Sequence, residues 1–461
     1  MTQWSNPVKL KGTAIFTKVL GENEHGVFLL RYRNKFYSKN VIIDKYHHHL
    51  NLDVSRSIDL KKSRLVKIIM TDKGILMVRA TFDRRSQSNL LLGQYFDYDL
   101  RPIGKEVELL RTPFQEFGDR GDFRVRVSDN ESFIAVYHSK RGVDENTTLS
   151  WDLFDGDFKK IRSVQTQIKV KNKRFYLNNF LVDDYGSIYS LTREFKERDK
   201  QKMVTEDRFF VQEGDSVWNL IMADTVDFRD LQMSYDRVNN KVVVVGLYGY
   251  RGHYGSRGIH IFSYYSRTRD YKQSFTPFTE QDTENLSMGK YNSEVIPEGF
   301  EFLKIVPRSD GGLVCIAEQM EVATENDIVM VNGIPTSTSK NIYNYNDILV
   351  LNIDSADQIE WSHVIHKNQT TVNDGGYFSS AVVYVDKHFV QLIYNDQIRS
   401  SGEVMQYTIY SNGKLMSKKL LKTELDYVVV IPMEAEQVSS NKLIIPSSKN
   451  RRFALLKLVY D

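Results

Sequence analysis

The sequence has very little cysteine, little proline and no excess of charge of one sign. Cys315 is the only cysteine among 461 residues, which excludes an intramolecular disulfide and a cysteine-based metal cage. Only 9 residues are proline and 41% are hydrophobic, a composition typical of a chain with a sizeable core and not of a disordered or fibrous one. With 62 Lys and Arg against 59 Asp and Glu, the formal net charge is +3. That balance lacks the excess that indicates a strong polyanion binder or an acidic tail.

Long hydrophobic runs are also absent. No uninterrupted apolar run reaches about 18 residues, so we expect no membrane span. Residues 1–4 lead directly into a strand-like segment at 7–11, without the basic and apolar regions of a secretory signal. The protein is therefore either cytoplasmic or exported with the signal removed and Met1 in its place. We favour a periplasmic or otherwise exported protein, because the structural pattern begins almost at residue 4.

One sequence pattern recurs along the chain: an apolar strand, a tight turn containing Asp, Asn, Gly or Lys, and a second, strongly apolar strand. Turns such as Thr71-Asp72-Lys73-Gly74 have the chemistry that β-hairpins favour. The second strands begin between 48 and 76 residues apart, an irregular period with insertions. We expect these second strands at residues 27–30, 75–78, 133–136, 188–191, 242–245, 313–316, 389–392 and 443–445.

The segments that follow each second strand predict the architecture. Alternating third strands are expected at 93–99, 259–264 and 404–410, and more polar fourth strands at 57–60 and 106–109. Four antiparallel strands per repeat make a β-propeller blade. The last repeat has three strands and no fourth, and residues 7–11 would supply it. The sequence thus predicts an all-β chain, one propeller domain over 1–461 with eight four-stranded blades, in which N- and C-terminal strands close one blade. Seven blades is the alternative, because 176–222 is poorly patterned.

The insertions predict where the protein works. Connections between second and third strands, and between successive blades, share one face of a propeller. This elaborated face carries the long segments at 110–122, 193–206, 249–257, 277–299 and 322–343, and repeat proteins place insertions on the binding face. Tyr and Arg often anchor interfaces, and 328–335 is an apolar segment with an Asn-Gly turn, expected to form a protruding hairpin. The predicted partner-binding residues are Arg84, Arg85, Tyr250, Arg251, Tyr254, Arg257, Val329, Val331 and Ile334.

Catalytic and metal motifs are weak. His47, His48 and His49 are expected in a solvated outer strand, and His363 and His366 on opposite faces of a strand. No nucleophile elbow, phosphate loop or dinucleotide fingerprint is present. We therefore predict no catalytic residue, no metal and no cofactor. Acidic residues within 280–298 share the elaborated face with the basic ones, so we do not expect a nucleic-acid partner.

The blade pattern, the terminal closure and the Lys-, Asn- and Tyr-rich composition resemble exported bacterial β-propellers that act as accessory subunits of envelope assemblies. Plug-like components of the Por (type 9) secretion translocon are an example. The resemblance implies a non-enzymatic propeller that docks a protein partner through the elaborated face. The alternative is a carbohydrate- or peptide-binding propeller, or a hydrolase, with a site at the mouth of the central channel built from aromatic and acidic side chains.

Overall fold

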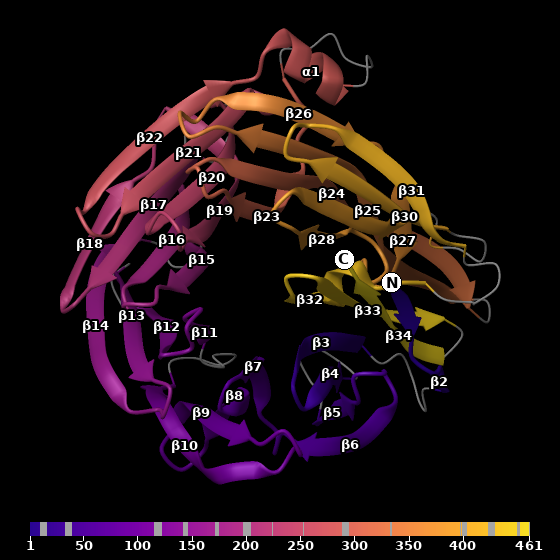
Figure 1. Cartoon of the computed structure of the whole chain (residues 1–461). Helices are drawn as coiled ribbons and strands as arrows, with labels where there is room; N and C mark the ends of the chain where they lie inside the picture. The colour runs from indigo at the N-terminus through magenta and orange to yellow at the C-terminus, as the bar shows by residue number, and fades with distance from the viewer. Residues whose placement is uncertain are drawn as a thin grey trace.

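The chain folds into a ring of eight antiparallel sheets around a central axis (Figure 1). The computed structural model describes residues 1–9, 16–32, 39–114, 122–141, 146–170, 175–196, 204–223, 225–251, 253–287, 295–331, 334–396, 398, 403–422, 429–449 and 452–460. In seven of the sheets the strands follow one another in sequence from the innermost to the outermost position, and in the eighth the outermost position is taken by N-terminal strands. The chain is an eight-bladed β-propeller. The prediction of eight blades is confirmed, and the alternative of seven is wrong.

The blades follow one another along the sequence. Blade 1 is β3 (Phe16–Asn23), β4 (Gly26–Tyr32), β5 (Asn40–Tyr46) and β6 (Leu52–Asp59). Blade 2 is β7 (Arg64–Thr71), β8 (Gly74–Asp83), β9 (Ser88–Phe96) and β10 (Pro102–Pro113). Blade 3 is β11 (Arg124–Val127), β12 (Phe133–Arg141), β13 (Asn146–Asp155) and β14 (Lys160–Lys169). Blade 4 is β15 (Phe175–Val182), β16 (Ile188–Lys196), β17 (Val204–Glu213) and β18 (Ser216–Ile221).

The second half of the ring carries the additions to the blade plan. Blade 5 is β19 (Val226–Asp236), β20 (Lys241–Tyr250), β21 (Gly258–Tyr265) and β22 (Asp270–Pro277), and helix α1 (Glu280–Ser287) follows it. Blade 6 is β23 (Phe300–Pro307), β24 (Leu313–Val331), β25 (Ile334–Ile353) and β26 (Ile359–Ile365), with β27 (Gln369–Val372) paired to β25. Blade 7 is β28 (Val382–Val385), β29 (Phe389–Asn395), β30 (Glu403–Tyr410) and β31 (Leu415–Lys422).

Blade 8 joins the two ends of the chain. Its inner strands are β32 (Glu436–Ser439), β33 (Lys442–Lys449) and β34 (Arg452–Val459), preceded by the short 3-10 helix η2 (Pro432–Glu434). Its outer position is filled by β1 (Thr2–Trp4) and β2 (Val8–Lys9), which both pair with β34. The expected closing strand is therefore real, but it is split, and its first half lies earlier than predicted. Residues 10 and 11 of that prediction lie outside the described residues. Closure leaves β34 without a free edge.

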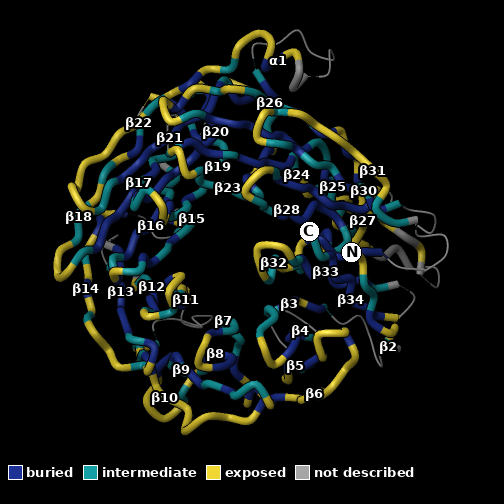
Figure 2. Tube along the Cα trace, viewed as in Figure 1, coloured by how far each residue is buried: buried dark blue, intermediate teal, exposed yellow. Residues whose placement is uncertain are grey.

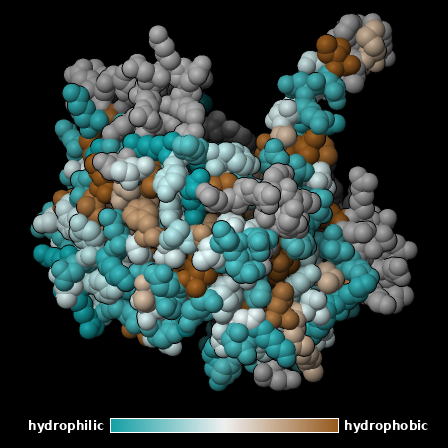
Figure 3. Space-filling model, turned by 90° about the horizontal axis from the view of Figure 1, so that it is seen from above, coloured by the Kyte–Doolittle hydropathy of each residue, from teal (hydrophilic) through white to brown (hydrophobic). Residues whose placement is uncertain are grey.

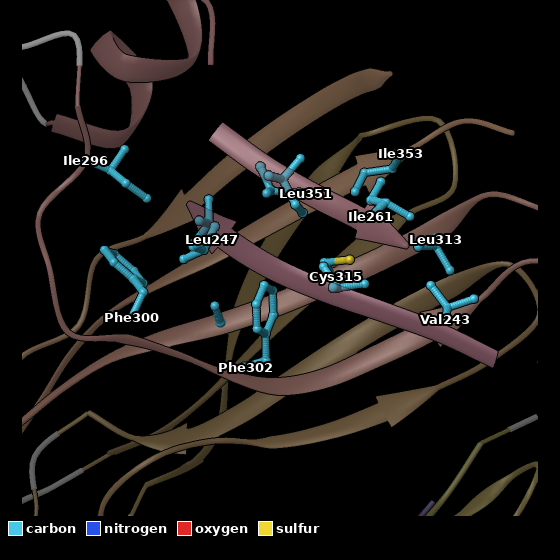
Figure 4. Packing of buried hydrophobic residues seen from close by; sticks show 14 residues of the cluster. Val243, Leu247, Ile261, Ile296, Phe300, Phe302, Leu313, Cys315, Leu351 and Ile353 are labelled. Atoms are coloured by element: carbon cyan, nitrogen blue, oxygen red, sulfur yellow. The ribbon is translucent and has the colours of Figure 1, made fainter. Parts of the chain in front are cut away.

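The hydrophobic core consists of eight clusters, one between each pair of neighbouring blades. All eight predicted second strands are the second strands of their blades, and they lie buried between neighbours (Figure 2). Between blades 5 and 6, for example, Val243 and Ile261 pack against Cys315 and Leu351 (Figure 4). Second strands need a continuous apolar sequence because both of their faces are covered. The outermost strands, such as β10, are mostly exposed and more polar.

The long connections lie on the elaborated face, as predicted. β24 and β25 form a hairpin of 19- and 20-residue strands, and α1 and β27 belong to connections between blades. The connection expected as a loop at 193–206 is shorter, because β16 extends to Lys196 and β17 begins at Val204. The connection at 277–299 contains α1, which the sequence analysis did not expect. Thr279 starts this helix: its Oγ1 accepts from the Asp282 amide and donates to the Asp282 carboxylate. In the part of the chain that the structure describes, no helix is long and apolar enough to cross a membrane.

Candidate functional site

Four of the predicted partner-binding residues lie together in the connection between β20 and β21. Tyr250 and Tyr254 are 52% and 67% exposed. The Arg257 guanidinium lies 4.9 Å from the centre of the Tyr250 ring, and the Arg251 Nε is 3.8 Å from the Asp227 carboxylate. The two arginines are therefore partly covered by their own neighbours, and the two tyrosines present the exposed surface.

Arg84 and Arg85 lie in the turn between β8 and β9, on the same face of the propeller but three blades away from Tyr250. Both are exposed. The turn is ordered by Asp83, which accepts hydrogen bonds from the Arg85 amide at 3.1 Å and the Ser86 hydroxyl at 2.7 Å. The structure therefore does not join these arginines and the β20–β21 connection into one patch.

The β24–β25 hairpin is the largest feature of the elaborated face. β23 pairs with β24 only as far as Gln319, and β27 supports β25 only between Ile342 and Tyr345. The remaining eight residues of β24, Thr324–Val331, extend roughly 26 Å at about 3.3 Å per residue, and a stalk of that kind projects from the body of the molecule (Figure 3). Its middle is polar, with the Lys340 Nζ 2.7 Å from the Glu325 carboxylate.

The end of this hairpin is apolar and exposed. Ile328 and Met330 are 78% and 66% exposed and are on the same face, since alternate residues of a strand point the same way. Of the predicted contacts, Val329 pairs with Thr336, and Val331 pairs with Ile334 next to the turn. The side chains of Val329, Val331 and Ile334 lie outside the described part of the structure. The predicted protruding hairpin is thus present in the backbone, and hydrophobic atoms lie near the end of the stalk (Figure 3).

A second candidate site, which the sequence analysis missed, lies at the axis of the ring. Four cations and one carboxylate from five inner strands converge there: Lys18, Lys67, Arg126, Lys304 and Glu436. We call this set the axial cluster. The charges act on one another across the ring, because Lys18, Lys67 and Lys304 all lower the pKa of the Glu436 carboxyl. The inner strands of blades 1, 2, 3, 6 and 8, which carry these residues, border the axis (Figure 1).

The register of the inner strands puts three of the lysines at one level. Lys18, Lys67 and Lys304 pair with Leu30, Val78 and Ile316, which are the fourth residues of the predicted second-strand runs. Asn179 and Gln232 occupy the same level in blades 4 and 5, where the Asn179 amide donates to the Gln232 oxygen at 3.3 Å. Register shifts adjoin Lys67, Asn179 and Lys304. A bulge of this kind changes the direction of a side chain, which explains why simple alternation does not locate them.

The surroundings perturb the charges of the axial cluster. The pKa of the Lys67 ammonium is lowered to about 8, mainly by burial and also by the cationic Arg126 and Lys18, while Glu436 acts in the opposite direction. Burial also lowers the pKa of Lys304 and raises that of Glu436. Glu436 is itself exposed to solvent, at the start of the inner strand β32.

Two cavities adjoin Lys304. One of about 330 Å³ is lined by Lys304, Val383, Glu436 and Gln437, among others, and one of about 160 Å³ by Lys304, Gln232 and Ser234, among others. A cavity of about 300 Å³ is at the small end of ligand-binding sites. The larger cavity thus has one cationic and one acidic side chain in its lining, and the smaller one has Lys304 as its charged side chain.

Carboxylates gather in blades 5 and 6, where the alternative function would need them. Burial raises the pKa of Asp230, Glu301 and Glu318, and the charges of Asp230 and Glu318 raise the pKa of Glu301 further. Asp230 accepts the Phe302 amide at 2.8 Å, and Glu318 is 2.7 Å from the Lys367 Nζ. Two of the three are thus engaged in structural contacts. Among the described residues, no group of three His, Cys, Asp or Glu side chains could hold a metal ion.

The histidine run lies elsewhere than expected. Residues 47–49 form the turn between β5 and β6, not part of an outer strand, because β5 ends at Tyr46. His48 has its Nδ1 2.9 Å from Glu22, which also binds the Lys457 Nζ at 2.6 Å. His363 contacts the Gly413 carbonyl at 2.6 Å through Nε2. These are local structural contacts.

Comparisons with known proteins give only distant likenesses. No protein-family model and no curated protein matches the sequence. Among solved structures, the polysaccharide lyase Uly1 is 10% identical, with a TM-score of 0.41 over 98% of this chain and 100% of that one. The β-propeller domain of the Trilobed protease from Pyrococcus furiosus is 10% identical, with a TM-score of 0.37 over 92% and 98%. The acylaminoacyl peptidase of Pyrococcus horikoshii is 8% identical, with a TM-score of 0.38 over 97% and 57%. Likenesses this distant transfer no activity to this chain.

Proposed function

We propose that the protein is a non-enzymatic interaction propeller that docks a protein partner through its elaborated face. The observation that carries the proposal is the β24–β25 hairpin, whose polar middle raises exposed Ile328 and Met330 away from the body. Exposed apolar side chains at the end of a two-stranded projection are unfavourable in water and prone to aggregation. A partner that covers these side chains removes them from water and so removes the unfavourable free energy of their exposure.

The chemistry of the hairpin specifies the kind of partner. The end is apolar, whereas the middle carries Glu325, Asp327 and Lys340 in mutual contact and so offers little unpaired charge. We therefore propose a partner with an apolar groove that receives the end of the hairpin. Tyr250 and Tyr254 would add a second, amphipathic contact on the same face. An accessory role in a bacterial envelope or secretion complex, and export to that compartment, are part of this proposal.

The test is purification from native cells with quantification of co-purified proteins by mass spectrometry. The wild-type protein is compared with the double variant Ile328→Asp/Met330→Asp and with the control Val238→Asp. Val238 is 73% exposed in the turn between β19 and β20, on the opposite face. We expect one stoichiometric partner with the wild type and the control, and its loss with the double variant.

Three results would contradict the proposal. The wild-type protein could elute alone, the double variant could retain the partner, or the control could lose the partner equally. Membrane fractionation of the same cells tests the envelope setting separately. Replacing Tyr254 with Ala measures the contribution of the β20–β21 connection, with Val238→Asp again as the control on the opposite face.

A further inference from the structure

The lysines of the axial cluster lack the close carboxylate that three of the buried lysines of the described chain have. Lys367, Lys457 and Lys45 lie 2.7, 2.6 and 3.0 Å from carboxylates. Lys18, Lys67 and Lys304, by contrast, have no carboxylate within 4 Å in the described part of the chain. Lys67 and Lys304 are half-buried, and removing an ammonium group from bulk water without a partner is costly, whereas Lys18 is exposed.

The cluster also gathers like charges that repel one another. The cluster has four cations and a single carboxylate, Glu436, whose pKa is raised by burial. The repulsion is evident at Lys67, whose protonated form is disfavoured by both Arg126 and Lys18. An anion bound between the lysines would offset this excess of positive charge.

The geometry suits an anion with more than one charged group. Lys18, Lys67 and Lys304 come from blades 1, 2 and 6, and they share one level of the axis with the amides of Asn179 and Gln232. Three ammonium groups on three different strands can each contact a different anionic group of one ligand. Of the three lysines, Lys304 alone lines the cavities of about 330 and 160 Å³, and the larger of them has the size of a small-molecule site.

We propose that the axial cluster binds a small polyanion, a molecule with two or more carboxylate or phosphate groups, through Lys18, Lys67 and Lys304. Arg126 adds positive potential, and Asn179 and Gln232 supply uncharged hydrogen-bonding groups. Glu436 opposes binding and sets an upper limit on affinity. This site is independent of the docking face, since it is built from the inner strands and not from the long connections.

The test is isothermal titration calorimetry of the full chain at pH 7 and low salt, with citrate as the polycarboxylate and inorganic pyrophosphate as the polyphosphate. We expect saturable binding of at least one, and the stronger of the two identifies the anionic group. Lys304→Met should weaken binding about tenfold or more, because it removes one charge-assisted contact. Lys105→Met, on the exposed outer strand β10, is the matched control and should leave affinity unchanged.

Two further measurements separate a built site from general electrostatic attraction. Glu436→Gln should strengthen binding, because it removes the only opposing charge of the cluster. Affinity should also fall between pH 7 and pH 9 as Lys67 loses its proton near pH 8, and Lys67→Met should remove that pH dependence. The charged groups that face Lys67 across the axis, Arg126, Lys18 and Glu436, remain in this variant.

The proposal is overturned if neither probe binds at millimolar concentration. It is equally overturned if Lys105→Met weakens binding as much as Lys304→Met, or if Glu436→Gln weakens it. Circular dichroism of each variant establishes that the propeller is folded. Failure here would leave the docking proposal unaffected, because that proposal depends on Ile328 and Met330.

Discussion

The buried ion pair between Glu318 and Lys367 should be among the most sensitive points of the fold. Glu318 lies in β24 and Lys367 in the connection that leads to blade 7, and their side chains are 2% and 0% exposed. The Lys367 Nζ also donates to the Tyr345 carbonyl and the Gln369 side chain, each at 2.9 Å. The pair thus fixes the base of the projecting hairpin to the neighbouring blade.

Removing one partner leaves the other buried without compensation. We expect Lys367→Met to lower the free energy of unfolding by about 3–5 kcal/mol. With a denaturant dependence of about 3 kcal/mol/M, that corresponds to a urea midpoint lower by more than about 1 M. Replacing both residues, in Glu318→Leu/Lys367→Met, removes both charges together and should recover most of the loss, since well-packed apolar pairs often equal buried ion pairs.

The assay is urea unfolding followed by both circular dichroism and tryptophan fluorescence. Lys419→Met is the matched control: its Nζ lies 2.6 Å from Glu403, but the lysine side chain is 55% exposed. An exposed pair contributes at most about 1 kcal/mol. The reasoning is refuted if Lys367→Met costs no more than Lys419→Met, or if the double variant is as unstable as the single one.

Three further predictions concern the closure and the core. Deleting residues 1–9 removes β1 and β2 and exposes the edge of β34, so light scattering should detect aggregation that the intact chain does not show. Ser190→Ala leaves the Trp151 indole N–H without its acceptor at 2.8 Å and should cost about 1–3 kcal/mol in urea unfolding; no measurable change would contradict this. Cys315 is 1% exposed and burial raises its thiol pKa, so it should react with a thiol reagent only after unfolding, and rapid labelling of the native protein would show that this interface opens.

The fold was predictable because its most regular feature is also its most apolar. The second strands are covered on both faces, which requires continuous hydrophobic runs such as 242–245, and these runs are visible without any alignment. The inner strand of blade 4 has a register shift between Leu177 and Asn179, which breaks the alternation by which a strand is recognised. The inner strands of blades 1, 2, 5 and 6 have the same kind of shift, and those blades were recognised from their second strands. Helix α1 is short and polar, so it has no apolar stripe to reveal it.

The site was predictable only in part. The hairpin was expected because an apolar segment with an Asn-Gly turn has a local signature, and β24 and β25 confirm it. The axial cluster has no such signature, because it depends on register between blades that lie far apart in sequence. A weak signal exists: Lys67 and Lys304 each interrupt an apolar first strand. Only the closed ring shows that these lysines meet.

The two proposed surfaces are compatible because of where the propeller keeps its core. The eight hydrophobic clusters lie between blades, so neither the axis nor the connections between strands are needed for burial. Charge can therefore collect at the axis, and long insertions can extend from one face, without interrupting any interface between blades. Repulsion between the lysines acts on the inner strands. Closure of the ring through β1 and β2 keeps these strands in place. A bound polyanion should accordingly stabilise the wild-type propeller, and it should stabilise the Lys304→Met variant much less.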